Sequence, residues 1–455
     1  MGKKGGICLE TLHAASTGQI YMAVAIFLIT YAIIITEKVH RAVIALLGAV
    51  LVVALGIVPL ENAFTIHIDW NTITLLIGMM ILVGITNRTG VFQFLAVRSA
   101  QMVKGNPAKI LLILSLLTGI FSAFLDNVTT VLLIVPVTFS ITRILKVDPF
   151  PFLIAEVLAS NIGGTATLIG DPPNIMIGQA NKHLTFNAFL FHLTPPVLLI
   201  LLVTIGLIYL FYRKKLKVTP ERQAEVMKLD ASGYITNRPL MLKSLAVLFL
   251  TIAGFFLHSV IHVETSVIAL AGGTLLMLIG VKEHEIEDVF HSIEWGTIFF
   301  FAGLFTLVGA LVETGVIQDL ARGALELTGG TVESIPLLSM LILWGSGFAS
   351  ATVDNIPFVA TMIPLIKDIG MGMGLPPDSP ILDVLWWSLA LGADLGGNGT
   401  LIGASANVIV AGLAAKEGHR FGYMDFLKLG APLTFIALIL STIYIFFRYL
   451  LPFLV

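Results

Sequence analysis

Long apolar runs alternate with short polar segments along most of this chain. A helix needs about 20 apolar residues to cross the hydrocarbon core of a bilayer, and several runs reach that length. We expect crossing helices at 18–36, 43–60, 71–87, 194–212, 240–261, 265–281, 296–312 and 431–450. The strands of outer-membrane barrels alternate in hydrophobicity over about ten residues, and that pattern is absent. The chain therefore reads as an all-α polytopic membrane protein.

One further apolar segment, 108–144, is too long for a single straight span. Roughly 37 helical residues would measure about 55 Å, and Asp126 and Asn127 lie at the middle of the segment. We expect a re-entrant helical hairpin with these two residues at its tip. Such a hairpin enters and leaves the membrane on the same side.

The next apolar run, 151–181, contains residues that interrupt a helix. Gly163 and Gly164 relax the backbone, and Pro172 and Pro173 follow Asp171 without backbone donors. A break at membrane depth is tolerated only where protein or water satisfies the freed backbone groups. We therefore expect a broken helix here, although a tight connection in a loop is the plainer alternative.

The second half of the chain repeats both interruptions. Residues 119–137 (GIFSAFLDNVTTVLLIVPV) match 347–365 (GFASATVDNIPFVATMIPL), and 161–174 (NIGGTATLIGDPPN) match 394–407 (DLGGNGTLIGASAN). The match predicts a first repeat over 18–212 and a second over 240–450. The equivalent hairpin and broken helix fall at 336–366 and 383–415, and residues 1–17 form an N-terminal tail.

Each repeat crosses the membrane five times, because the hairpin enters and leaves on the same side. An odd number of crossings puts the two consecutive repeats in opposite orientations. Cytoplasmic loops are rich in Lys and Arg. In repeat one, we assign the loops 37–42, 88–109, 142–149 and 213–228 to one face. They contain Lys38, Arg41, Arg88, Arg98, Lys104, Lys109, Arg143, Lys146, Arg213, Lys214, Lys215, Lys217, Arg222 and Lys228. The equivalent segments of repeat two contain only Arg322, Lys367 and Arg448. This bias predicts inverted repeats and a cytoplasmic linker, 213–239, which we interpret as a solvated connector rather than a regulatory site.

Composition excludes several other classes. Hydrophobic residues make up 57% of the chain and charged residues 12%, against about 25% charged in soluble domains. Cys8 is the single cysteine, which leaves no intrachain disulfide, and the net charge is −2 without a basic patch for nucleic acid. A Walker lysine and an HExxH zinc motif are both missing, which argues against an ATP-driven pump and against an enzyme. The start of the chain lacks a signal-peptide pattern, so the first apolar run should remain a membrane helix.

The hairpin tips and broken helices carry the candidate chemistry. Asp, Asn and Gly-rich backbone are costly in hydrocarbon, so their duplication predicts one buried polar site built from both repeats. In repeat one, the candidates are Asp126, Asn127, Thr129, Thr130, Asn161, Gly163, Gly164, Thr165, Thr167, Asp171 and Asn174. In repeat two, they are Asp354, Asn355, Asp394, Gly396, Gly397, Asn398, Thr400, Ser405 and Asn407. The alternative for each Asp-Asn pair is a simple helix N-cap.

Carboxylates and unwound carbonyl groups suit a hard cation, while half-helix N-termini favour an anion. We expect a coupling ion, Na⁺ or H⁺, and no other cofactor. The residues expected to bind Na⁺ are Asp126, Asn127, Asp354, Asn355 and Asp394. Glu156 lies in the apolar run before the first break and is either a proton carrier or an interfacial residue. Arg88 and Glu313 occupy equivalent helix ends, which we expect at the membrane interface.

At these motifs the chain resembles the ion transporter superfamily, in its branch of arsenite permeases and NhaD-type Na⁺/H⁺ antiporters. It is most similar to P-protein-like members with a citrate-transporter-like domain. The motifs are SAFLDNVTT (122–130), NIGGTATLIGDPPN (161–174), SATVDNIPF (350–358) and GGNGTLIGASAN (396–407). The resemblance covers 18–450 and implies a scaffold domain, a transport domain that moves as an elevator, and a homodimer formed through the scaffold. Dicarboxylate carriers of the superfamily have Ser-Asn-Thr where this chain has Asp-Asn, which argues against a citrate- or succinate-type substrate.

Our leading hypothesis is a secondary active ion transporter in the cell membrane, coupled to Na⁺ or H⁺. Na⁺/H⁺ exchange or cation-coupled anion transport ranks first, and arsenite export second. Its partners would be the lipid bilayer and a small inorganic ion or anion. The alternative is an ion channel in which the same broken helices line a conducting path.

Overall fold

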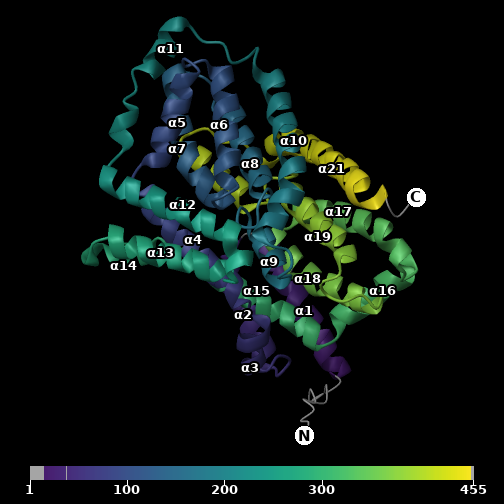
Figure 1. The fold of residues 1–455 in the computed structure, drawn as a ribbon. Coiled ribbons are helices and arrows are strands. Elements are labelled where there is room, and N and C mark those ends of the chain that lie inside the picture. The colour runs from purple at the N-terminus through teal and green to yellow at the C-terminus, as the bar shows by residue number, and fades with distance from the viewer. Residues whose placement is uncertain (1–14, 37, 452–455) are drawn as a thin grey trace.

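The computed structural model describes residues 15–36 and 38–451, and in these ranges the chain forms helices and turns without a strand (Figure 1). The first half contains α1 (Thr17–Ile35), α2 (Arg41–Ala54), α3 (Leu60–Asn62), α4 (Trp70–Asn87), α5 (Val91–Met102), α6 (Pro107–Ser122), α7 (Asn127–Leu145), α8 (Phe150–Gly164), α9 (Pro172–Ala180) and α10 (Phe186–Tyr212). The connector contains α11 (Pro220–Met227). The second half contains α12 (Arg238–Ile261), α13 (Thr265–Gly280), α14 (Ile286–His291), α15 (Trp295–Glu313), α16 (Val316–Thr328), α17 (Ile335–Thr352), α18 (Asn355–Gly372), α19 (Pro380–Gly396), α20 (Ser405–Lys416) and α21 (Tyr423–Ile445).

Eight helices of the described ranges are long and apolar enough to cross a membrane: α1, α4, α7, α10, α12, α15, the helix ending at Thr352, and α21. Shorter apolar helices, α2, α6, α8, α13 and α20, lie among them. Most of the predicted N-terminal tail falls outside the described residues. Helix α1 begins at Thr17 because Ser16 and Gln19 cap each other's backbone N–H groups.

Helices from the two halves pack in a matching pattern. Helix α6 packs against α8, and α17 packs against α19. The two halves also interleave, since α2 packs against α15 and α4 against α13. The helices that follow each break cross over as well, with α9 on α18 and α20 on α7. One apolar core runs through both halves and includes Leu82, Phe189, Phe301 and Trp387.

Glycine allows the closest of these helix crossings. A Cβ atom added at Gly163 of α8 would lie 2.1 Å from the carbonyl oxygen of Gly119 in α6. One added at Gly396 of α19 would lie 2.4 Å from the carbonyl oxygen of Gly347 in α17. Both crossings therefore bring backbone against backbone, as small residues do in membrane helix pairs.

Three sequence-based boundaries were wrong. The expected loop 88–109 is mostly helix α5, which buries Phe92, Ala96 and Val97 while polar residues interrupt its apolar run. The expected span 43–60 ends early, because helix α2 stops at Ala54 before Gly56, whose φ is +68°. The last helix of repeat one starts at Phe186 rather than 194, since α10 continues through its internal prolines.

The connector is not simply solvated. Leu216, Val226 and Ala231 are buried, and they join an apolar cluster with α5, α6 and α7. Nε2 of Gln101 donates to the carbonyl oxygen of Leu229 at 2.8 Å, and the backbone N–H of Thr236 donates to the carbonyl of Thr89. In Figure 1 the connector passes over the end of the molecule formed by α5, α6 and α7. It therefore packs on the first half of the chain.

Candidate functional site

The tip of the first interrupted segment lies between α6 and α7. Asp126 is the N-cap of α7: its Oδ1 accepts the backbone N–H of Thr129 at 2.9 Å, and its Oδ2 accepts the Thr129 hydroxyl. Thr167 donates its hydroxyl to the carbonyl oxygen of Ala123 just before this tip. The cap therefore satisfies a free backbone N–H group at the start of α7. The next residue, Asn127, points into the protein, where it is buried.

The two unwound segments are held in the same way. Nδ2 of Asn174 donates to the carbonyl oxygens of Thr165 and Thr167 at 3.1 and 3.0 Å. Nδ2 of Asn407 donates to the carbonyl oxygens of Gly397 and Thr400, both at 2.9 Å. Each asparagine therefore fixes the break that precedes its own helix. The hydroxyl of Thr400 donates to Ala351 just before the second tip, at 2.5 Å.

A buried polar network joins the two halves. Nδ2 of Asn127 donates to Oδ1 of Asn161 at 3.1 Å and to Oδ2 of Asp171 at 3.0 Å. Nδ2 of Asn161 in turn donates to Oδ1 of Asn398 at 2.8 Å and to Oδ1 of Asn407 at 2.9 Å. These last two hydrogen bonds lie in the interior and join residues that are 237 and 246 positions apart in the chain.

Two buried carboxylates have side-chain oxygens without a hydrogen-bond partner. Asp394 is 1% exposed, and neither of its side-chain oxygens has a hydrogen-bond partner. Asp171 is equally buried, and its Oδ1 has none. Asp171 lies within Coulombic range of Asp126 and Asp354, and Asp394 within range of Asp171. The four predicted carboxylates therefore lie close enough for the charge of each to affect at least one of the others.

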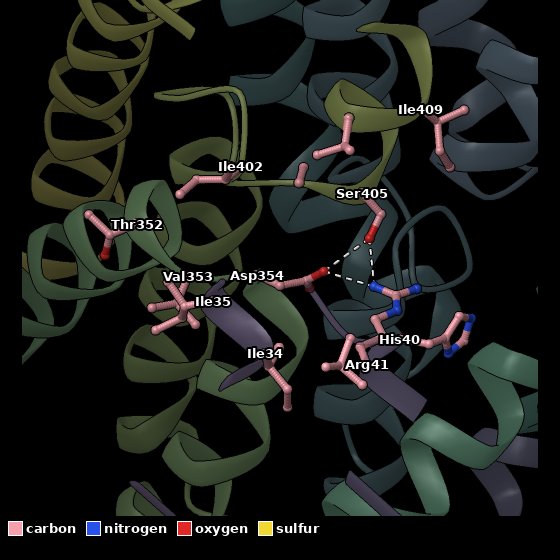
Figure 2. Close-up of a pocket in the computed structure, with 13 residues that line it drawn as sticks. Ile34, Ile35, His40, Arg41, Thr352, Val353, Asp354, Ile402, Ser405 and Ile409 are labelled. Carbon is pink, nitrogen blue, oxygen red and sulfur yellow. Dashed lines mark hydrogen bonds and ion pairs between the residues drawn. The ribbon is translucent and has the colours of Figure 1, made fainter. Parts of the chain in front are cut away.

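The second tip, between α17 and α18, has a different environment. Asp354 caps α18 through Ile356, and its Oδ2 also accepts the Ser405 hydroxyl and Nη1 of Arg41, both at 2.9 Å. The same Arg41 Nη1 lies 2.6 Å from Oγ of Ser405. Figure 2 shows Arg41, Asp354 and Ser405 pointing toward one another. A cation at Asp354 would have to compete with this arginine.

These three residues line a cavity of about 420 Å³ (Figure 2). Its wall comes from the end of α1 and the start of α2, from the second tip, and from the start of α20. Apolar side chains, including Ile34, Ile402 and Ile409, form most of the remainder. Apart from His40 and Thr352, the polar side chains of the cavity wall are those of Arg41, Asp354 and Ser405, which meet at one point.

Sequence reasoning missed Arg41. It was counted in a cytoplasmic loop, whereas it is the first residue of α2 and its side chain is only 28% exposed. Lys367 was also assigned to a loop, but it lies within α18 and donates to the carbonyl oxygen of Ala180 at 2.8 Å. The contact between Arg41 and Asp354 spans 313 residues, so no local pattern signals it.

Other candidates take supporting positions. The hydroxyl of Thr165 donates to the carbonyl of Asn161 at 2.9 Å, and the hydroxyl of Thr130 is buried without a partner. Asn355 is 4% exposed. Ser160 and Ser350, which the sequence did not single out, donate to the carbonyl oxygens of Asn127 and Ala393. These two hydrogen bonds join α8 to the start of α7 and α17 to α19.

Glu156 is fully buried between α7 and α8, where its Oε1 accepts the Thr138 hydroxyl at 2.6 Å and its Oε2 has no partner. Glu156 therefore lies inside the protein, and its role as a proton carrier or as an interfacial residue stays a prediction. Glu313, at the end of α15, accepts hydrogen bonds from Asn62 at 2.8 Å and lies 3.1 Å from Nε2 of His67. Within the described residues, no group of three or more His, Cys, Asp or Glu forms a metal site of the usual type.

Comparison with known proteins identifies the family. A family model described as citrate transporter matches residues 31–392, well over half of the chain. The chain belongs to the citrate transporter family. This member is therefore a membrane transporter rather than an enzyme, and its apolar helices make it an integral membrane protein.

Curated relatives support this assignment. The transporter is 44% identical over 432 residues to an uncharacterized transporter of Mycobacterium tuberculosis, covering 94% of this chain and 98% of the relative. It is 43% identical over 433 residues to a 46 kDa membrane protein of Mycobacterium leprae, with 94% and 99% covered. It is 34% identical over 517 residues to the P protein of Mus musculus, with 96% and 61% covered. The predicted similarity to P-protein-like members is confirmed, and the arsenite permease and NhaD branch stays a prediction.

Solved structures show the same fold at low sequence identity. The YdaH transporter of Alcanivorax borkumensis has a TM-score of 0.57 at 13% identity, covering 96% of this chain and 98% of the other. MtrF of Neisseria gonorrhoeae has a TM-score of 0.56 at 12% identity, with 94% of each chain covered. Both similarities concern the fold alone.

Proposed function

We propose that this member of the citrate transporter family is a secondary active transporter whose coupling cation, Na⁺ or H⁺, binds at Asp126, Asp171 and Asp394. The observation that carries the proposal is the carboxylate of Asp394, which is buried without any hydrogen-bond partner. An isolated carboxylate charge in a dry interior is far too costly to keep. A proton or a metal cation must neutralise it, and a cation held there can be released on the other side of the membrane.

The transported solute is a small inorganic ion or anion. The first candidates are Na⁺/H⁺ exchange and cation-coupled anion transport, and the next is arsenite export. The family's name makes citrate a compound to test, although the Asp-Asn tips argue against it. Buried asparagine amides beside the carboxylates supply oxygen ligands of the kind that Na⁺ prefers.

The helix packing supports movement of one part against another. We define the scaffold helices as α1, α2, α4, α12, α13 and α15, and the transport helices as α5–α10 and α16–α21. The scaffold helices interleave through α2 with α15 and α4 with α13. The tips and broken helices all belong to the transport helices. We propose inverted repeats and an elevator motion in which the transport helices carry the cation site past the scaffold.

The test uses purified protein in liposomes that contain a pH-sensitive dye, with Na⁺ and pH gradients imposed separately. A dye response to Na⁺ alone would indicate exchange, and a response that needs phosphate, citrate or arsenite would identify the solute. Asp394→Asn should lower the coupled rate by at least about tenfold, which corresponds to about 1.4 kcal/mol. Asp383→Asn, in the same helix but bonded to His183, is the matched control and should remain active.

Full coupling in Asp394→Asn would refute the proposed cation site. Absence of any gradient effect in the wild type would refute the transport class. Single-channel currents with no exchange would instead support the ion channel.

A further inference from the structure

A basic cavity lies at the end of the molecule that carries the connector, and it shares no residue with the buried polar network. Its volume is about 510 Å³, and its wall comes from the start of α6, the end of α10 and the connector. Four of the lining side chains are exposed cations: Lys109, Arg213, Lys214 and Lys217. None of the lining residues is Asp or Glu. The basic cavity therefore has a concentrated positive charge and no carboxylate in its wall to offset it.

A second cavity near the connector shows a different balance of charge. Arg143 and Lys146 line it together with Asp148 and Glu417, and Arg143 forms an ion pair with Glu417. In the part of the chain that the structure describes, no ion pair includes any of the four cations of the basic cavity. Basic residues that only set the orientation of a membrane helix can lie anywhere in a loop. These four come from distant segments of the chain and surround one cavity.

Backbone packing builds the basic cavity from these segments. Helix α11 of the connector packs on α5 and α7, and a Cβ atom added at Gly105 would lie 2.5 Å from the carbonyl oxygen of Gln223 in α11. Gly105 has a φ of +68°, which suits glycine. The next residue, Asn106, caps α6 by accepting the backbone N–H of Lys109 at 3.1 Å. These contacts hold the start of α6 against the connector, so the cavity is formed before a ligand arrives.

The side chains around the basic cavity place it at the surface of the bilayer. Helix α10 is apolar enough to span a membrane, and Leu207, Leu210 and Phe211 in its last turns are exposed. Tyr209 lines the cavity, and the guanidinium carbon of Arg213 lies 6.0 Å from the centre of the Tyr209 ring. Tyrosine is enriched at the level of the lipid headgroups. The cavity thus lies at headgroup depth, beside apolar side chains that face the acyl chains.

We propose that the basic cavity binds the phosphate headgroup of an anionic phospholipid, with the four cations around the phosphate and the apolar end of α10 against the acyl chains. A guanidinium binds phosphate through paired N–H donors, and lysines contribute point charges. Clusters of about four to eight basic residues beside a membrane helix are typical of sites for anionic lipids. A volume of about 510 Å³ is within the usual range for small-molecule sites, about 300–1,000 Å³.

The test measures the melting temperature of the full-length purified protein in a neutral detergent while phosphatidylglycerol or phosphatidylcholine is added. Phosphatidylglycerol should reach half of its effect at a concentration at least about tenfold lower, because several cations attract its net charge. Salt should reduce this preference, since screening weakens interactions between exposed charges. Inorganic phosphate and glycerol phosphate should give no comparable rise, because they lack acyl chains.

Two double variants with the same loss of charge separate a specific site from general attraction. Lys109→Gln combined with Arg213→Gln should remove the preference for phosphatidylglycerol. Lys215→Gln combined with Lys228→Gln is the control, because both lysines are exposed in or beside the connector and neither lines the cavity. The control should keep the preference. Exposed substitutions rarely change stability by more than about 0.5 kcal/mol, so both variants should melt near the wild type without added lipid.

Three outcomes would overturn the inference. They are an equal response of the wild type to both lipids, an equal loss of the preference in both double variants, and the same rise with inorganic phosphate or glycerol phosphate. The last result would make the cavity a site for a free phosphate anion. The comparison of lipids on the wild type needs no variant, so it decides even if a variant does not fold. Asp394→Asn should leave the lipid preference unchanged, so the proposed cation site and the lipid site can fail separately.

Discussion

Asp126 and Asp354 hold equivalent places in the chain but have different partners. Both cap the helix that follows, through Thr129 and Ile356 respectively. Asp354 also forms an ion pair with Arg41, whereas Asp126 adds a hydrogen bond from the Thr129 hydroxyl. The shared Asp-Asn pair therefore carries an ion-paired carboxylate at the second tip and a carboxylate bonded to Thr129 at the first. The difference comes from Arg41, which faces the second tip, and from the motif itself, where Pro357 matches Thr129.

At the residue scale, we predict that Asp126→Asn uncouples transport while the protein stays folded. Asn is as good an N-cap as Asp, so the melting temperature should hardly change, but the negative charge is lost. The measurement is gradient-driven flux in liposomes, paired with a melting curve of the same sample. The control is Asp319→Asn, which removes an exposed carboxylate paired with Arg322. Near-normal coupled flux in Asp126→Asn would show that this aspartate is only a cap.

Helix crossings decide how closely the elements of the site approach one another. The breaks at Gly163 and Gly396 lie against the backbones of Gly119 and Gly347. This contact places each unwound segment beside the tip of the neighbouring helix pair. The Thr167 and Thr400 hydroxyls then bind the backbone just before those tips. Sequence reasoning assigned these glycines to unwinding and to ligand carbonyls, and the structure adds their role in close packing.

At the element scale, Gly163→Ala and Gly396→Ala should each destabilise the protein. The new methyl group would lie 2.1 or 2.4 Å from a carbonyl oxygen, so two helices must move apart. Overpacking of this kind costs about 1–3 kcal/mol, which denaturant unfolding or a melting curve in detergent would detect. Gly345→Ala in α17 is the control, because a Cβ there meets nothing within 4 Å. Alanine favours a helix over glycine by up to about 1 kcal/mol, so this control should be neutral or slightly stabilising. Equal stability of all three variants would contradict the packing role.

The orientation of the elements gives a second test at this scale. We expect the connector on the cytoplasmic face and the segments around Glu333 and Asp378 on the opposite face. Single cysteines at these exposed positions and at Lys228, in a Cys8→Ser background, should react differently with a membrane-impermeant maleimide. In intact cells, the cysteines at 333 and 378 should be labelled and the one at 228 protected until the membrane is opened. Labelling of all three from the same side would refute the inverted arrangement.

For the whole molecule, the contact between Arg41 and Ser405 joins a scaffold helix to a transport helix. Its atoms lie 2.6 Å apart, so an elevator motion must break the contact in every cycle. A reducible bifunctional thiol reagent that links Arg41→Cys to Ser405→Cys, in the Cys8→Ser background, should stop transport. Reduction of the link should restore it.

The matched control links two positions that move together. Arg143 of α7 and Glu417 after α20 form an ion pair at 2.5 Å, and both belong to the transport helices. A link between cysteines at 143 and 417 should leave transport intact. Full transport with the link at 41 and 405 in place would contradict a sliding motion at this contact.

The sequence by itself determined the membrane class and singled out most of the polar residues that meet in the buried network. Apolar runs of bilayer length and polar residues at duplicated interruptions are local patterns, and local patterns are visible in a linear chain. It also indicated the family through motifs such as NIGGTATLIGDPPN. It missed α5, because a short helix with polar residues in its sequence resembles a loop.

Only the tertiary structure decided which polar groups meet. Asn161 reaches Asn398 and Asn407, and Arg41 reaches Asp354, through contacts between residues more than 200 positions apart. Such contacts depend on how two halves of the chain interleave, and no short-range pattern of hydrophobicity encodes that arrangement. The charge of each carboxylate's surroundings follows from the same packing. The fold therefore places Arg41 of the first half against Asp354 of the second, while Asp394 of the second half stays buried without a hydrogen-bond partner.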